Sequence, residues 1–271
     1  MQMQRRRPSR RDCQYHAGMS AQMEPLVNRL VEEGAALLAQ PRMPAQFAYE
    51  PAADAILNDI EQYPQAFVFG CLCNRQGSAK QAWLVPLRVL QRFGTLDVGA
   101  LAQRSQADWE RVMRRPEPIH RMPEKMAGVL YLGVQQLSNE YGGDAGRIWA
   151  DTPPSAAVVR RFLEFYGAGP KIASMAVNIL VRQFKVPLRD HHFVDISIDR
   201  QVRRVMTRLG LVPAGASDLL LIYAAREAYA EFPGIFDLAL WRIGRTVCRE
   251  SAPRCGKCPL ADLCGYAATT N

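Results

Sequence analysis

Apolar residues recur at intervals of three and four along most of this chain. The interval holds at Leu26, Leu30, Val31, Leu37 and Leu38, then at Ile56 and Ile60, and again at Met126, Val129, Leu130 and Leu137. This spacing places an apolar stripe on one side of each helix, as in amphipathic helices that share a core. Breaks divide the pattern into about ten helices, at residues 41–44, 116–118, 153–154 and 213–217. With no convincing run of alternating strands, we predict an all-α fold.

The first residues do not follow this pattern. They carry a single acid, Asp12, and five arginines: Arg5, Arg6, Arg7, Arg10 and Arg11. We predict that residues 1–23 form a basic flexible arm that adds phosphate contacts to a nucleic acid. A disordered tail, or a true start at Met19 or Met23, is an equal alternative.

Charge and cysteine content narrow the class of protein. A net charge of +8 and a pI near 9.3 favour a polyanionic partner such as nucleic acid, although an ordinary basic protein has the same balance. No run approaches the roughly 18 apolar residues of a membrane span, and no apolar signal-peptide core follows the N-terminus. The seven cysteines do not resemble a disulfide framework. We therefore expect a cytoplasmic protein whose clustered cysteines bind metal.

Four of the cysteines lie close together near the C-terminus, at Cys248, Cys255, Cys258 and Cys264. Four soft ligands in one loop suit either an iron-sulfur cluster or a zinc ion. Structural zinc sites usually use two closely spaced pairs, and here only the middle two cysteines form one, which favours a 4Fe-4S cluster. The same loop carries cations that we expect to contact a phosphate backbone, namely Arg249, Arg254 and Lys257.

A glycine-rich turn joins two helical stretches at residues 165–173. Gly167 and Gly169 permit positive φ and close approach of another backbone, and their free amides can seat a phosphate. Pro170 suits the first turn of the next helix, and Lys171 follows it at the positive end of the helix dipole. We expect a lowered pKa for Lys171, which would make it a nucleophile for a sugar carbon, whereas the ordinary alternative is a solvated surface lysine.

Downstream, Asp195 follows Val194 and precedes another helix. This carboxylate is either an N-cap or a group that faces the cleft and stabilises an oxocarbenium ion. Asp199 and the pair His191 and His192 have surface or capping roles as their default interpretation, although they could reach the same cleft.

Together these residues resemble the endonuclease III-like helix-hairpin-helix (HhH-GPD) DNA glycosylases, over about residues 54–266. The resemblance implies a two-lobed all-α fold with a C-terminal iron-sulfur loop. The expected parts are the arm (1–23), a central helical domain with the hairpin (57–189), and a cluster domain (24–56 with 190–271). It also implies Lys171 as the nucleophile and Asp195 as the catalytic carboxylate. Gln76 would fill the gap left by a flipped nucleotide. Residues 120–122, including Arg121, would form a loop that probes the opposite strand.

The implied function is base excision repair. The protein would bind double-stranded DNA with a damaged base or abasic site as a monomer near the nucleoid. It would remove the base, an oxidised pyrimidine by family precedent, and cleave the strand by β-elimination. Phe165, Tyr166, Ile172 and Ser197 depart from the family pattern and leave the excised base open. The alternatives are a monofunctional or mismatch-specific glycosylase, such as the adenine branch that lacks the lysine, or a non-catalytic iron-sulfur or zinc DNA-binding protein.

Overall fold

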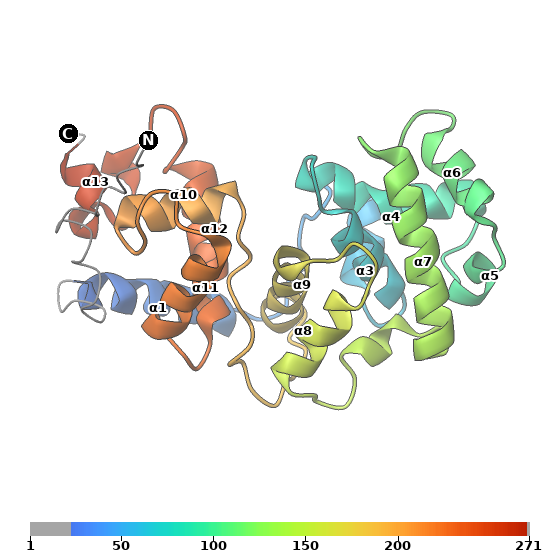
Figure 1. The fold of residues 1–271 in the computed structure, drawn as a ribbon, viewed down its shortest axis with the longest axis horizontal. Helices are drawn as coiled ribbons and strands as arrows, with labels where there is room; N and C mark the ends of the chain where they lie inside the picture. The colour runs from blue at the N-terminus through green and yellow to red at the C-terminus, as the bar shows by residue number, and fades with distance from the viewer. Residues whose placement is uncertain (1–22, 270–271) are drawn as a thin grey trace, which may run out of the picture.

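The computed structural model describes residues 23–269, and these form helices and no strand. Thirteen α-helices and four short 3-10 helices follow one another, so the all-α prediction is confirmed. The helices gather into two lobes joined across the middle of the molecule (Figure 1). The predicted arm spans residues 1–23, and all of it except Met23 lies outside the described residues.

The first lobe is built around one fully buried helix. All ten residues of α3 (Pro64–Cys73) are buried, so this helix is apolar on every side and forms the centre of the lobe. Its neighbours cover it on several sides, and α3 packs with α4, α7 and α9. The helices of this lobe are α2 (Pro51–Asn58), α3, α4 (Ala79–Phe93), α5 (Val98–Ala102), α6 (Gln106–Arg114), α7 (Pro123–Tyr141), α8 (Ser155–Leu163) and α9 (Pro170–Arg182).

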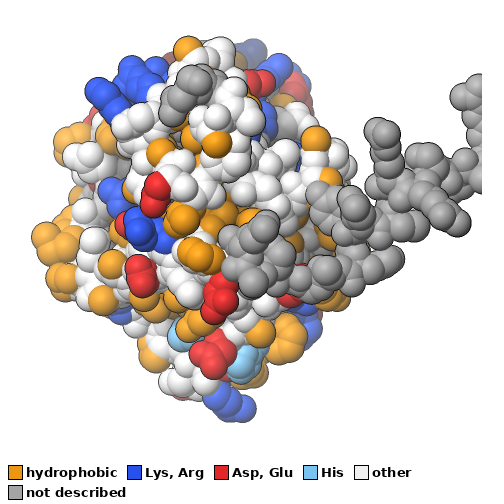
Figure 2. Space-filling model, turned by 90° about the vertical axis from the view of Figure 1, so that its left-hand side faces the viewer, with side chains coloured by type: hydrophobic (Ala, Val, Ile, Leu, Met, Phe, Trp, Pro, Cys, Tyr) orange, Lys and Arg blue, Asp and Glu red, His pale blue; other side chains and the backbone are white. Residues whose placement is uncertain are grey.

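The second lobe combines the two ends of the described chain. Helix α1 (Glu24–Ala39) packs against the 3-10 helix Pro233–Phe236 and against α12, as the side-by-side blue and orange helices of Figure 1 show. Basic and acidic side chains are both spread over the end face of this lobe (Figure 2), so that face is not one continuous basic patch. The remaining helices are α10 (Arg200–Leu209), α11 (Asp218–Ala228), α12 (Asp237–Thr246) and α13 (Gly265–Ala268).

One expected boundary is wrong. Residues 51–56 were placed with the second lobe, but α2 begins at Pro51 and packs on α3 and α4. Its apolar face, Ala53 and Leu57, is buried in that contact. The first lobe therefore includes the whole of α2. No described helix is both long enough and apolar enough to span a membrane.

The segment from α9 to α10 runs between the lobes and is held on both sides. From the first lobe, the Asn178 side-chain amide donates to the Asp195 carbonyl at 2.7 Å. From the second lobe, the Gly234 amide donates to the Val194 carbonyl at 2.6 Å, and the Ser197 amide donates to the Asp237 carboxylate at 2.6 Å. These bonds fix the backbone that leads to the start of α10.

Candidate active site

Only one of the two glycines in the hairpin between α8 and α9 occupies a position that a larger residue would not fit. Gly167 has φ +79°, and a Cβ there would lie 2.9 Å from Nη1 of Arg75. Gly169 has φ −124°, and a Cβ there would meet no atom within 4 Å. The expected positive φ and close approach are therefore found at Gly167 and not at Gly169, whose carbonyl accepts from the amides of Ile172 and Ala173 in α9.

Lys171 is the second residue of α9 and is half-buried. Its Nζ donates to the backbone oxygen of Asn74 at 3.0 Å and to the side-chain Oδ1 of the same residue at 3.1 Å. The pKa of Lys171 is lowered, chiefly because burial disfavours the ammonium, while Asp199, Cys71 and Asp237 oppose the shift. The direction agrees with the sequence expectation, but its main cause is burial.

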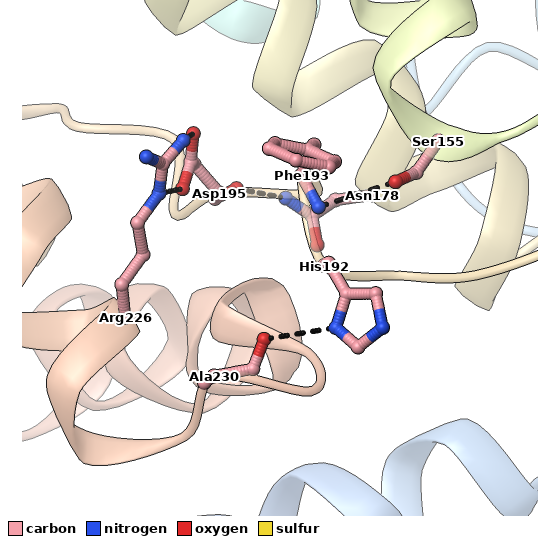
Figure 3. Close-up of polar contacts among 7 residues, drawn as sticks. All are labelled: Ser155, Asn178, His192, Phe193, Asp195, Arg226 and Ala230. Carbon is pink, nitrogen blue, oxygen red and sulfur yellow. Dashed lines mark hydrogen bonds and ion pairs between the residues drawn. The ribbon is translucent and has the colours of Figure 1, made fainter.

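Asp195 is held by an arginine of the second lobe. Nε and Nη2 of Arg226 donate to its two carboxylate oxygens at 2.7 and 2.9 Å (Figure 3), and Asp195 is only 9% exposed. Its backbone carbonyl bonds to Asn178, about two helical turns or about 10 Å beyond Lys171 along α9. Asp195 is therefore paired with Arg226 of α11 and is not a free carboxylate, while its expected role at the cleft stays a prediction.

Two other carboxylates act on Lys171. Asp199 is the N-cap of α10, where its Oδ1 accepts from the amides of Gln201 and Val202 at 2.7 and 2.9 Å. Among the groups that raise the pKa of Lys171, Asp199 has the largest effect. Asp237 begins α12, and burial raises its pKa to about 6, while Lys171 acts to lower it. Of the surface and capping roles expected by default for Asp199, the structure shows the capping one, and the charge of this cap also favours the ammonium of Lys171.

The loop after α3 packs against the hairpin. Gln76 is exposed and has φ +46°, an uncommon left-handed conformation for a residue with a side chain. Arg75 is half-buried, with its Nε donating to the Leu72 carbonyl at 3.1 Å and its Nη2 buried without a hydrogen-bond partner. The loop thus presents Gln76 outward while Arg75 supports the turn at Gly167.

Two of the three residues at 120–122, the expected probing loop, are buried or half-buried. His120 is 4% exposed, and its Nδ1 accepts from the Met122 amide at 3.1 Å. Burial lowers the pKa of His120, while its hydrogen bonds to the backbone of Cys73 and Arg75 act in the opposite direction. Met122 is half-buried against the core. Only Arg121 of this group has an exposed side chain.

The four clustered cysteines are half-buried and line one common cavity with apolar side chains of α10 and α12. Arg208 reaches the same place: its Nη1 lies 3.5 Å from the Cys248 sulfur, its Nη2 donates to the Glu250 carbonyl at 2.9 Å, and its guanidinium stacks on Tyr266. Within residues 23–269, no three metal-binding side chains come close enough together to hold a single ion. The cations of the loop are all exposed: Arg249, Arg254 and Lys257.

Comparisons with known proteins agree with this architecture. No protein-family model matches the sequence. The adenine DNA glycosylase of Mycobacterium tuberculosis is 40% identical over 78 residues, or 26% of this chain and 24% of that protein. The corresponding enzyme of Mycolicibacterium smegmatis is 40% identical over 68 residues, or 24% of this chain and 23% of that protein. The chain thus spans about a quarter of the length of the curated relatives it matches.

The similarity of structure is more extensive. A trapped covalent intermediate of endonuclease III with DNA matches over 91% of this chain and 97% of that chain, with a TM-score of 0.59 and 18% identity. A thermostable thymine-DNA glycosylase matches over 92% and 97%, with a TM-score of 0.58 and 13% identity. This chain therefore has the two-lobed helical fold of the endonuclease III-like DNA glycosylases.

Proposed function

We propose that this protein is a DNA glycosylase with an associated abasic-site lyase activity. The observation that carries the proposal is Lys171, a half-buried lysine of lowered pKa at the start of α9, directly after the hairpin. A lysine that loses its proton easily can attack C1′ of a nucleotide and form a Schiff base. Asp199 supplies the nearby negative charge that stabilises the oxocarbenium-like transition state.

Double-stranded DNA with a damaged base or an abasic site is the proposed partner, bound by a monomer inside the cell. The hairpin at Gly167 and Gly169 offers backbone amides to a phosphate, and the exposed Arg121, Arg249, Arg254 and Lys257 add cations. Gln76 would enter the gap left by the extruded nucleotide. Unstacking costs a few kcal/mol, and a lesion that pairs poorly reduces this cost.

The cysteine loop is proposed to hold a 4Fe-4S cluster. Thiolates suit both iron-sulfur clusters and zinc, but zinc requires its sulfurs within about 2.3 Å of one ion. The four cysteines line one shared cavity, and their spacing in the sequence, with a single close pair, favours the cluster. When bound, the cluster would fix the loop that carries Arg249, Arg254 and Lys257. Analysis of iron, acid-labile sulfide and zinc in the purified protein tests this assignment.

A panel of lesion-bearing duplexes tests the proposed activity. We expect excision of an oxidised pyrimidine, cleavage on the 3′ side of the abasic site, and a borohydride-trapped adduct. The variant Lys171→Gln should lose trapping and cleavage and retain DNA binding. A Lys171→Gln protein that still traps with borohydride at the rate of the wild type would rule out the proposed nucleophile.

The similarity to adenine DNA glycosylases favours a second candidate, monofunctional or mismatch-specific excision. This activity would release a base and leave an intact abasic strand, which breaks only after alkali treatment. The same duplex panel, scored with and without alkali, separates the two candidates. Duplex binding without excision of any base in the panel would instead indicate a non-catalytic DNA-binding protein.

A further inference from the structure

The amine of Lys171 is held by a single residue of another helix. Asn74, at the end of α3, offers both its backbone oxygen and its Oδ1, at 3.0 and 3.1 Å from Nζ. An ammonium only donates hydrogen bonds, so the Asn74 side chain must face it with its oxygen. These two residues are 97 positions apart in the chain, and their contact joins the start of α9 to the centre of the first lobe.

Asn74 is itself fixed. Its amide donates to the Cys71 carbonyl at 3.0 Å, and the next amide, of Arg75, donates to the Cys73 carbonyl at 2.8 Å. The helix before it is buried along its whole length. Because burial and these bonds restrict the backbone here, the two acceptors are presented to Lys171 from a rigid position.

The two hydrogen bonds to Asn74 determine the direction of the lone pair on Nζ of Lys171. An ammonium has three N–H donors, and Asn74 takes two of them. Among the described residues no acceptor is bonded to the third, so this is the proton most easily lost. The neutral amine keeps its two bonds to Asn74, and its lone pair takes the direction that the third proton occupied.

We propose that Asn74 is a positioning residue that aims the lone pair of Lys171 at C1′ of the extruded nucleotide. The proposal rests on the proposed function and adds a residue to it. The third proton leaves Nζ, the lone pair forms the N–C1′ bond, and the bond between C1′ and the base breaks with its electron pair on the base. The base takes up one proton from solvent, so one proton is lost and one gained, while the adduct nitrogen keeps the two protons bonded to Asn74.

Asn74 also differs from the other groups around the amine because it is neutral. Asp199 from α10, Asp237 from α12 and Cys71 from α3 favour the ammonium, whereas Arg75 opposes it. A neutral acceptor orients the amine without adding a further negative charge that would hold its proton. This property separates the role of Asn74 from that of a carboxylate at the same place, and a single substitution tests it.

The test is borohydride trapping on an abasic duplex under single-turnover conditions, measured across pH. In Asn74→Asp, a carboxylate beside the ammonium should move the acidic limb of the profile up by about one pH unit or more. The aspartate oxygens still accept from Nζ, so the plateau at high pH should stay within about threefold of the wild type. In Asn74→Ala, one acceptor is lost and the plateau should fall about 10-fold to 100-fold at every pH, as expected for a misdirected nucleophile.

Asn139→Asp is the matched control, because Asn139 is an exposed asparagine of α7 and the change adds the same charge. Its profile should match the wild type. DNA affinity and melting temperature are measured for each variant, so that a general loss of folding is recognised. Since Asn74→Asp is expected to stay active, the proposal can still be tested if the alanine variant folds poorly.

The outcomes separate this inference from the proposed function. A wild-type protein that forms no adduct overturns the proposed function and this inference with it. The role of Asn74 alone is overturned if the wild-type protein forms the adduct but either variant fails its expectation. For Asn74→Asp this means an unshifted acidic limb of the pH profile, and for Asn74→Ala an unchanged trapping plateau. Competitive acetylation of Lys171 in the DNA-free protein gives a readout independent of activity: Asn74→Asp should lower its reactivity near neutral pH, and unchanged reactivity would contradict the contact.

Discussion

Asp195 and Asp199 should respond in opposite ways to the same substitution, from aspartate to asparagine. Asp195 forms a bidentate pair with Arg226, with side chains that are 12% and 32% exposed. An exposed pair contributes about 0–1 kcal/mol, and removing one partner of a buried pair costs about 3–5 kcal/mol. This partly buried pair lies between these limits, so we expect Asp195→Asn to cost about 2 kcal/mol.

For a chain of this size, that loss corresponds to a fall in melting temperature of about 4–8 °C. The chemistry should survive, because the Asp195 carboxylate is paired with Arg226 and is not among the groups that shift the pKa of Lys171. We expect Asp195→Asn to retain single-turnover trapping within about threefold of the wild type at a temperature below its transition.

Asp199→Asn should show the reverse. Asparagine caps a helix about as well as aspartate, so the start of α10 and the melting temperature should be preserved within about 1–2 °C. The carboxylate with the largest effect on the pKa of Lys171 is lost, and single-turnover trapping on a lesion-bearing duplex, which requires base release, should fall about 100-fold or more. Thermal melts and single-turnover trapping of both variants test the contrast. A stable Asp195→Asn protein that is as inactive as Asp199→Asn would refute this assignment.

Three further predictions concern the surroundings of the site. Gly167→Ala should destabilise the protein by about 1–2 kcal/mol and weaken DNA binding, because Gly167 has a positive φ and lies close to the guanidinium of Arg75. Gly169→Ala should leave the stability measured in urea melts nearly unchanged. Asp237 has a pKa raised from 3.8 to about 6 in the folded state, so its contribution to stability is present below about pH 4 and lost as pH rises through 6. Asp237→Asn should therefore gain stability relative to the wild type between pH 4 and 7, by about 1–3 kcal/mol, and an unchanged difference across that range in calorimetry would contradict the assigned pKa. Arg208→Gln should lower the iron content of the purified protein, because it removes contacts to the Cys248 sulfur and the Glu250 carbonyl.

The helical fold and the hairpin could be predicted because their determinants are local. Apolar residues at intervals of three and four predict helices wherever they occur, and Pro170 with Gly167 fixes a turn within a few residues. Lys171 follows from the same local pattern. Its orientation does not, because the residue that holds it, Asn74, lies 97 positions earlier.

The choice between two nearby carboxylates depends on contacts that are distant in the sequence. Asp195 and Asp199 are four residues apart, and the sequence pattern alone does not say which of them forms an ion pair and which caps a helix. The choice depends on Arg226, 31 residues after Asp195, and on the bonds that hold the segment between the lobes. His120 is a similar case, because it is buried by packing against the loop after α3 and the residues next to it in the sequence do not predict this.

The position of α1 has a consequence for how the chain is made. This helix leaves the ribosome well before its partners, the 3-10 helix Pro233–Phe236 and α12, have been made. The lobe of α2 to α9 can collapse on α3 while the rest is still being synthesised, because its contacts lie within one continuous stretch. The other lobe cannot close until residues 233–246 have been made, since the main helix contacts of α1 are with them. The cysteine loop is therefore assembled last, on a chain whose hairpin and lysine are already in place.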